Sequence, residues 1–550
     1  MLQRHTPRIH RRRRPVGFRL LLVLGLAGLV GCGRDAPAGR SLSIVLHHGN
    51  NSRPYMPWPE DVAKQVAASL EEVGFDVQIR KEDWASYLKL VQDGNHQMAL
   101  LGWSADIPDA DNFLYVLLDK ANARAGSASN ISFYTSEEVH QLLVAARRTS
   151  DGAERLRLYA EAQEIIDREA PMVPLVYGEK MIAYRAPFGP LAVEPVVHPQ
   201  LRRVQGPKDG TLVYLRGSDS VLLDPGDATD GESSKVIEQV FDTLLRFRPG
   251  STEVEPSLAV SWTHDEARTT WRFRLREGVR FHDGALLDGA AVAGAFERQR
   301  DPGHPHAFGD ANYAYWKDLF GFVDRVAPGA DPLEVVFHLN EPAPPFFLAM
   351  LAAFNASIPS PKAFDELGKD VRRHPVGTGP FRFVKWDGGV EIELARNDDY
   401  WDGAPALARV RFLVSENATV RSRRLLSAEQ ADLIDNIDPQ TLGELEASAD
   451  VVVAREPGLN IGYLAMNTQK APFDDVRVRQ AVAIAIDKTR IVRTAYKGVA
   501  QAATTPVPPT VVGHAAGIAP RADHSTPAGH AAAVAEARRL LREAGFAVGD

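Results

Sequence analysis

The feature that most constrains this chain is the alternation of strand-like and helix-like patterns in its first third. Residues 41–46 (SLSIVL) and the apolar stretch 98–103 have the composition of buried strands. Between them, within residues 59–74, apolar side chains recur every three or four positions, after an opening proline and before a closing glycine. Strands and helices that alternate in this way predict an α/β lobe.

The pattern changes after Gly210, where short alternating strands such as residues 271–275 (WRFRL) are separated by frequent Gly and Pro. Helical periods return in residues 476–486 and 532–544. A chain of 550 residues is too long for one hydrophobic core and suits two or three domains. The net charge of -8 gives no reason to expect nucleic-acid binding and does not favour an anionic membrane surface.

The N-terminus has the pattern of an export signal. A basic block at residues 11–14 precedes the apolar run 20–30 (LLLVLGLAGLV), which is too short to cross a bilayer. The run ends in Leu-Val-Gly-Cys, which resembles a bacterial lipobox, so we expect Cys32 to be acylated and residues 33–40 to form a tether. The alternative is that Cys32 is only a small apolar residue that ends the signal. We expect a periplasmic or cell-envelope protein whose contact with the membrane is the lipid anchor alone.

Several chemistries are not expected from this sequence. Cys32 is the only cysteine, which excludes a disulfide within the chain and a two-cysteine redox motif. The sequence has no HExxH, GxSxG, Walker A or CxxC motif. Asp106, Asp109 and Asp111 lack the glycine and the distal glutamate of a calcium-binding loop. We therefore expect no enzymatic activity, no metal site and no cofactor.

Two blocks of sequence carry a family resemblance. They are similar to the oligopeptide, dipeptide and nickel family of ABC-transporter solute-binding proteins, above all to its dipeptide-binding members. The resemblance implies a two-lobed α/β fold, the type II periplasmic-binding-protein fold of the large peptide-binding class with an extra subdomain. It also implies a monomer that closes over a short peptide and delivers it to the permease of an ABC importer. The blocks are residues 52–113 and a series that starts at 211 (TLVYLRGSDS) and includes 257–262 (SLAVSW), 271–284 (WRFRLREGVRFHDG), 377–386 (GTGPFRFVKW) and 458–488.

The order of the two blocks is reversed relative to the family, which indicates circular permutation. In the family, the block that begins like residue 211 comes first, and the block with RPY and GWSADIPDADNF follows it. Joining residue 550 to residue 39 would restore the usual order, and residues 204–210 (VQGPKDG) have the composition of a short linker between the old ends. The alternative is a scrambled gene product that does not fold.

The permuted order predicts how the chain divides between the lobes. We expect a continuous lobe I at residues 176–467, including the linker 204–210. Lobe II is then split between residues 41–175 and 468–550. The chain should cross between the lobes near residues 174–178 and 466–471.

A site that buries a free peptide must pair both of its terminal charges, because unpaired buried charges are costly. Arg53 lies in Arg-Pro-Tyr, and Asp106 lies in Gly-Trp-Ser-Ala-Asp. The resemblance implies that Arg53 holds the peptide carboxylate, which a planar guanidinium can bond through both oxygens. It also implies that Asp106 holds the ammonium group. Without the resemblance, a solvated loop arginine and a turn-capping aspartate would be the ordinary interpretations.

Five more residues complete the predicted ligand-binding set: Tyr55, Gly102, Trp103, Gly462 and Tyr463. Tyr55 and Trp103 could wall the pockets for peptide side chains, or they could be ordinary core residues. Two other functions stay open. The same fold could receive a nickel chelate, haem or a sugar, or the protein could act as an envelope sensor or chaperone without a role in transport.

Overall fold

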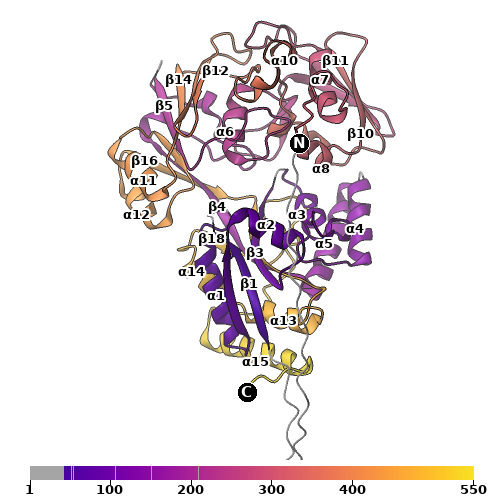
Figure 1. Cartoon of the computed structure of the whole chain (residues 1–550), viewed down its shortest axis with the longest axis vertical. Helices are drawn as coiled ribbons and strands as arrows, with labels where there is room; N and C mark the ends of the chain where they lie inside the picture. Colours follow the sequence, from indigo (N-terminus) through magenta and orange to yellow (C-terminus); the bar gives the residue numbers. More distant parts are fainter. Residues whose placement is uncertain are drawn as a thin grey trace, which may run out of the picture. The chain divides into compact units, whose positions relative to one another are not determined.

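One long strand, β4 (Met172–Arg185), pairs with two different groups of strands in a 12-stranded sheet among the described residues (Figure 1). The structure is a computed structural model that describes residues 42–50, 53, 55–105, 107–149, 151–207 and 210–549. The part of β4 up to Gly178 pairs with β17 and β18, and the part from Glu179 onward pairs with β15 and β16. A single strand therefore belongs to both halves of the sheet.

We call these groups the β1 half and the β5 half of the sheet. Mixed parallel and antiparallel pairing and the flanking helices confirm the predicted α/β class. The β1 half contains β1 (Ser43–Gly49), β2 (Asp76–Glu82), β3 (Met98–Ser104), β17 (Asn460–Met466) and β18 (Ala500–Ala502). The β5 half contains β5 (Thr211–Arg216), β12 (Phe381–Asp387), β13 (Glu391–Arg396), β14 (Arg409–Val414), β15 (Leu433–Asp435) and β16 (Val451–Pro457).

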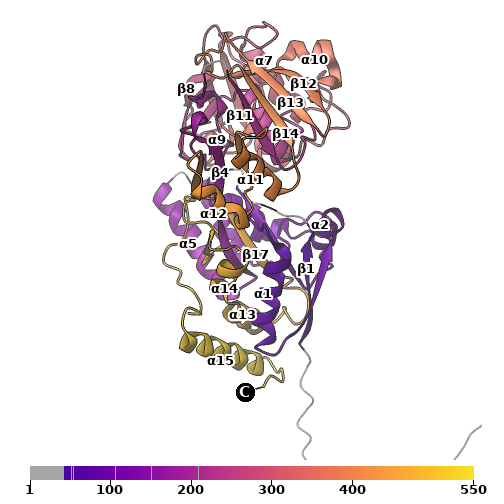
Figure 2. The same ribbon diagram turned by 90° about the vertical axis from the view of Figure 1, so that its left-hand side faces the viewer.

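Helices cover both faces of the β1 half, so its strands are apolar on both sides. In β17, Leu464 and Met466 pack in one hydrophobic cluster, whereas Ile461 and Tyr463 pack in another. This alternation follows from the two-residue period of a strand. The first cluster lies against α1 (Pro59–Glu71), α13 (Val476–Ala485), α14 (Lys488–Thr494) and α15 (Pro527–Glu543), the last of which packs beside α13 (Figure 2). The second lies against α2 (Trp84–Gln92), α3 (Asp111–Leu118), α4 (Glu137–Arg148) and α5 (Gly152–Glu169).

A separate antiparallel sheet forms the core of the extra subdomain that was expected from the resemblance. Its aromatic core is built on edge-to-face contacts, with ring centroids 5.5 Å apart for Phe273 and Phe337 and 5.0 Å apart for Phe296 and Phe337. The strand order is β10-β11-β9-β8, and the elements are β8 (Ala259–His264), β9 (Thr270–Leu275), β10 (Val323–Pro328), β11 (Glu334–Leu339) and the covering helix α7 (Gly289–Arg300).

The passage from β16 to β17 carries the chain from one half of the sheet to the other. β16 pairs with β4 from Glu179 to Arg185, whereas β17 pairs with the earlier part of β4 and with β3. The chain therefore changes halves between Pro457 and Asn460. This position precedes the expected crossing at residues 466–471, because β17 lies entirely within the β1 half.

Some sequence predictions fall outside the described residues. They include the export signal, Cys32 and the tether 33–40, and two positions of the linker, Lys208 and Asp209. Among the residues that the structure does describe, no helix is both long and apolar enough to cross a membrane.

His96 is a fully buried titratable group in the β1 half. Its side chain is 0% exposed, and its Nε2–H donates to the backbone carbonyl of Ile131 over 2.9 Å. Burial lowers the pKa of His96 to about 4, because an imidazolium would lose its hydration there. In the unfolded chain a histidine has its ordinary pKa of about 6.5.

This difference predicts acid destabilisation. Between pH 6.5 and pH 4 the unfolded chain binds a proton at His96 that the folded chain does not bind, so the free energy of unfolding falls as the pH falls. Over this pH window His96 lowers the free energy of unfolding by about 3 kcal/mol. Urea unfolding of His96→Gln at a series of pH values should show a shallower pH dependence. The exposed His374→Gln should keep the wild-type slope. Equal slopes in all three proteins would contradict the assignment.

Candidate functional site

The carboxyl ends of three parallel strands meet at one edge of the β1 half. β1 pairs with β2 on one side and with β3 on the other, all in parallel. The loop after β1 carries Arg53 and Tyr55, α2 begins at Trp84 just after β2, and Trp103 lies near the end of β3. In open α/β sheets, ligands bind beyond the carboxyl ends of the strands. This edge is therefore the candidate ligand-binding site.

Arg53 is a half-buried cation at this edge. Backbone hydrogen bonds with Met56 in both directions, 3.2 and 2.9 Å long, fix the loop that carries it. Its guanidinium carbon lies 4.0 Å from the centroid of the Trp84 ring. Its Nε is buried without a hydrogen-bond partner, and no carboxylate among the described residues forms an ion pair with it. The aromatic ring thus holds a side chain whose charge no carboxylate of the described residues neutralises.

Tyr55 lies across two glycines that pair with each other. Gly102 of β3 and Gly462 of β17 are register partners. A Cβ on Gly102 would lie 2.1 Å from Cδ2 of Tyr55, and a Cβ on Gly462 would lie 2.8 Å from the Tyr55 carbonyl oxygen. That oxygen accepts a 2.7 Å hydrogen bond from the hydroxyl of Tyr496. Burial raises the pKa of Tyr55 to about 12. The two glycines are needed because larger residues would displace Tyr55.

Trp103 and Tyr463 lie on the opposite face of the same strands. Trp103 donates from Nε1 to Oδ1 of Asn112 over 2.8 Å and packs against the cluster beside α3, α4 and α5. Tyr463 is 1% exposed within that cluster, where burial raises the pKa of its hydroxyl. The strand period thus separates these two residues from Tyr55 and the glycines. A ligand role for the pair stays a prediction.

Asp106 lies outside the described residues, but its neighbours are placed. The backbone N–H of Ala105 donates to the carbonyl of Leu459 over 2.8 Å. Ile107 is 1% exposed and belongs to the hydrophobic cluster of the four-stranded sheet. Farther along, Asp109 forms a bidentate ion pair with Arg155 over 2.6 and 2.7 Å, and Arg155 is only 5% exposed. Asp109 thus has a structural partner.

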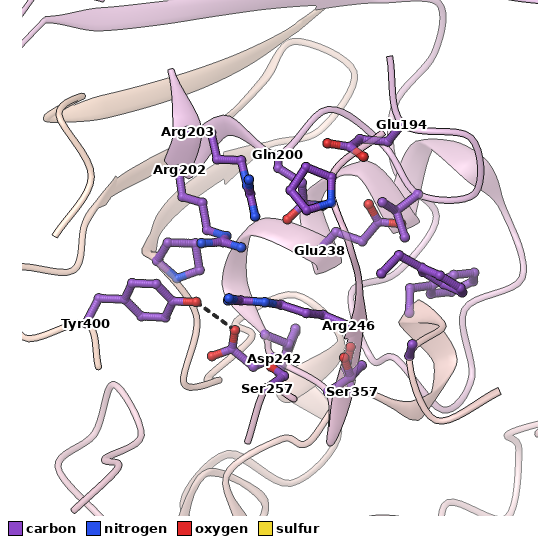
Figure 3. Close-up of a pocket in the computed structure, with 18 residues that line it drawn as sticks. Glu194, Gln200, Arg202, Arg203, Glu238, Asp242, Arg246, Ser257, Ser357 and Tyr400 are labelled. Atoms are coloured by element: carbon purple, nitrogen blue, oxygen red, sulfur yellow. Dashed lines mark hydrogen bonds between the residues drawn. The ribbon is translucent and has the colours of Figure 1, made fainter. Parts of the chain in front are cut away.

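A second concavity is lined by residues from several segments between positions 194 and 400, and many of the lining side chains are polar (Figure 3). Its charged groups bind one another or nearby partners. Arg246 pairs with Asp402 over 2.7 Å, and Asp242 accepts from the hydroxyl of Tyr400 over 2.9 Å. Burial raises the pKa of Glu238 to about 8. Arg202 and Arg246 both bond Asp402, and Asp242 also accepts from Thr378 and Trp401, so this network is largely bonded within the protein and carries no ligand assignment. The labelled lining residues are Glu194, Gln200, Arg202, Arg203, Glu238, Asp242, Arg246, Ser257, Ser357 and Tyr400.

Three residues at the site were missed by sequence reasoning. Trp84 stacks on Arg53, Tyr496 holds the Tyr55 carbonyl, and Asn112 orients Trp103. Trp84 had a usable signal, because it begins a helix directly after a parallel strand. Tyr496 had none, since it is 441 positions from Tyr55 in the sequence. Among the described residues, the group of histidine and acidic side chains close enough to hold a metal lies elsewhere, between α14 and α15.

Comparisons with known proteins place the chain among bacterial binding proteins. The sequence profile described as "Bacterial extracellular solute-binding proteins, family 5 Middle" matches residues 47–125 and 253–550. The chain is 33% identical over 321 residues to heme-binding protein A of Haemophilus influenzae, covering 55% of this chain and 58% of that protein. It is 32% identical over 324 residues to the dipeptide-binding protein of Escherichia coli, covering 55% and 59%. The matched parts thus span less than two thirds of these relatives.

Solved structures agree with this result. The periplasmic binding protein of Helicobacter pylori in complex with the peptide STSA is 30% identical, with a TM-score of 0.54 that covers 62% of this chain and 67% of that chain. The binding protein HbpA2 of Haemophilus parasuis is 29% identical, with a TM-score of 0.54 over 61% and 67%. The predicted type II binding-protein fold of the peptide-binding class is therefore confirmed.

The glycine pair at the site can be tested directly. We expect Gly102→Ala to lower the melting temperature by several degrees, because its Cβ would meet Tyr55 and, at 2.5 Å, the Ile461 carbonyl oxygen. Gly152→Ala is the matched control, since a Cβ there meets nothing within 4 Å. Thermal unfolding by circular dichroism measures both. Equal melting temperatures for the two variants would show that Tyr55 does not need the glycine.

Proposed function

The chain belongs to the bacterial extracellular solute-binding proteins of family 5, and we propose that it captures short peptides, dipeptides above all, for an ABC importer. It is a binding protein and not an enzyme. In this proposal the peptide lies beyond the carboxyl edge of the β1 half, and a permease receives it there. We expect a monomer to carry out the capture.

The observation that carries the proposal is the guanidinium of Arg53, which forms no ion pair with any carboxylate of the described residues. It is half-buried, stacked at 4.0 Å on Trp84, and has an Nε without a partner. A peptide carboxylate would supply the missing anion through charge-assisted hydrogen bonds. Asp106 would hold the peptide ammonium group. Aromatic surface from Tyr55 and Trp103 would contact side chains of the peptide with little demand on their identity.

The relatives support the peptide class and also keep a second candidate open. One relative is named a dipeptide-binding protein, and one solved neighbour holds the peptide STSA. Another relative is named heme-binding protein A, which favours haem as the competing ligand. Haem also carries carboxylates that could bond Arg53, so recognition of a carboxylate alone does not distinguish a peptide from haem. Recognition of a free ammonium group does distinguish them, because only the peptide has one.

Calorimetric titration with a dipeptide, its C-terminal amide and haem tests the proposal. Truncating one member of a buried charge pair costs about 2 to 5 kcal/mol, so Arg53→Ala should weaken dipeptide binding about 30-fold or more. The C-terminal amide should bind weakly to the wild type and lose little further affinity in Arg53→Ala. Arg80→Ala, at an exposed position, is the control. Full affinity for the amide would contradict the role of Arg53, and binding of haem but not of dipeptides would favour the second candidate.

We further propose that the chain is a circular permutation of its family, with a split lobe II, expected at residues 41–175 and 468–550, and a continuous lobe I, expected at 176–467. The change of halves between Pro457 and Asn460 moves the later boundary, so that β17 belongs to lobe II. The profile of the family's middle region matches in two separate segments, and the unmatched residues 126–252 lie between them. In a chain of ordinary order, the flanks of a middle region lie at the two ends. Here the unmatched residues lie on both sides of the linker 204–210. This arrangement is expected if the two ends of an ordinary family chain are joined at the linker.

The placement of the described ends supports the same proposal. The carbonyl of Leu42 accepts from the backbone N–H of Asp76 over 3.0 Å. Val548 lies beside the same turn, since a Cβ on Gly74 would lie 2.8 Å from its Cγ1. Leu42 and Phe546 share one hydrophobic cluster. A short connection could therefore join these two parts of the chain.

Reordering the gene tests the permutation. A chain with residues 210–550 followed by 41–204 should melt within a few degrees of the natural order and bind the same dipeptide, because only two surface connections change. The control is a chain opened between Arg272 and Phe273 in β9, which should melt much lower because it cuts a paired strand. A reordered chain that melts as low as this control would contradict the proposal.

We also propose that Cys32 is lipid-modified and that the mature protein works in the periplasm or at the cell envelope. The support is the signal-like sequence before Cys32 and the extracellular character of the family. In this arrangement the lipid is the only membrane attachment, and the tether 33–40 leads into lobe II.

A further inference from the structure

We propose that His524, His530 and Asp487 form a binding site for a divalent transition-metal ion, separate from the ligand-binding edge. Each of the three side chains offers one ligand atom, and these atoms all lie within 4.8 Å of one another. Asp487 precedes α14, and the two histidines flank the start of α15. Asp487 is 8% exposed, whereas both histidines are half-buried, so an ion can reach them from solvent.

The hydrogen bonds of the two histidines fix which ring nitrogens carry protons. Nε2 of His524 lies 2.9 Å from the carbonyl oxygen of Ile484, and Nε2 of His530 lies 2.9 Å from Oε2 of Glu72. A carbonyl and a carboxylate only accept hydrogen bonds, so both Nε2 atoms donate. In the neutral rings, both Nδ1 atoms then carry lone pairs. This tautomer is the one that binds a metal through Nδ1.

The two Nδ1 atoms face each other at 3.0 Å. Two lone pairs at this distance repel unless a cation lies between or beside them. A shared proton would satisfy the two nitrogens, but it would not engage the carboxylate of Asp487, whose Oδ1 caps α14 by accepting from the backbone N–H of Arg490. A metal ion would use all three groups at once, and the outer bonds to Ile484 and Glu72 are of the kind that orient metal-binding histidines.

The charges around the cluster keep Glu72 in this supporting position. Arg490 donates from Nη1 to Oε1 of Glu72 over 3.1 Å, and Arg538 donates to its backbone carbonyl over 2.8 Å. The backbone N–H of Arg490 also donates to Oδ1 of Asp487 over 2.8 Å, which fixes the carboxylate at the start of α14. Glu72 therefore stays bonded to Arg490 and His530, while Asp487 is the carboxylate available to an ion.

The ligand set indicates the class of metal. Two imidazole nitrogens and one carboxylate oxygen, with a fourth position open to water, suit Zn²⁺ and neighbouring divalent ions. Mg²⁺ and Ca²⁺ prefer oxygen ligands and fit this set poorly. Glu72 follows directly after α1, whose 13 residues correspond to about 20 Å, so the metal site lies at the end of α1 opposite to the end that follows the Arg53 loop. An ion here would fasten α15 to α1 and α14.

Zinc binding to the full chain tests the site. When Zn²⁺ is added back to the chelator-treated protein, we expect elemental analysis to find one Zn²⁺ per chain. The added Zn²⁺ should also raise the melting temperature. His524→Ala and His530→Ala should each abolish both effects, and Asp487→Asn, which can still cap α14, should weaken binding at least 10-fold. His514→Ala is the matched control, because His514 lies in the same segment but bonds the carbonyl of Val507. X-ray absorption should show two imidazole ligands near 2.0 to 2.1 Å.

Three results would overturn the proposal. The first is no bound Zn²⁺ in the wild type, which would leave only a proton shared between the histidines. The second is Zn²⁺ binding that survives both histidine variants. The third is Zn²⁺ that is displaced by dipeptides, which would place the ion at the ligand-binding edge.

Discussion

The pairing of β4 with strands on both halves of the sheet is the constraint on which the rest of the structure depends. Backbone hydrogen bonds continue from β17 and β18 to β15 and β16 along one uninterrupted strand. Buried backbone groups must be paired, so neither half can lose this strand without exposing unpaired N–H and C=O groups. The edge that carries Arg53 and the clusters of the β5 half are therefore connected through a shared element and not only through side-chain contacts.

The two-residue period of a strand decides which predicted site residues can act together. Gly102 and Gly462 point to the face where Tyr55 lies, and Trp103 and Tyr463 point to the other. A sequence motif does not show on which face of the sheet each of its residues lies until the strand register is known. The same period explains why the glycines matter: they make room for an aromatic ring from a loop, and they contribute no side chain of their own.

Sequence patterns predicted the α/β class and the extra subdomain, because hydrophobic periods and long matching motifs report local structure. They also singled out Arg53, whose loop follows a recognisable strand, and its ligand role stays a prediction. They could not find Trp84 as its partner, since stacking depends on how two loops meet. They predicted no metal site, because Asp487 is distant in sequence from His524 and His530, and the supporting Glu72 lies 458 positions from His530. The tautomers that make this cluster informative depend on hydrogen bonds to Ile484 and Glu72, which only the fold defines.

The direction of β1 has a consequence for access. β1 begins at Ser43 on one edge of the sheet and ends at Gly49 on the other, and its length corresponds to about 23 Å. Ser43 therefore lies at the edge of the β1 half opposite to the one that Arg53 follows. The start of the described chain and the candidate ligand-binding edge are thus separated by the full length of a strand, so a probe attached near Ser43 would lie away from Arg53.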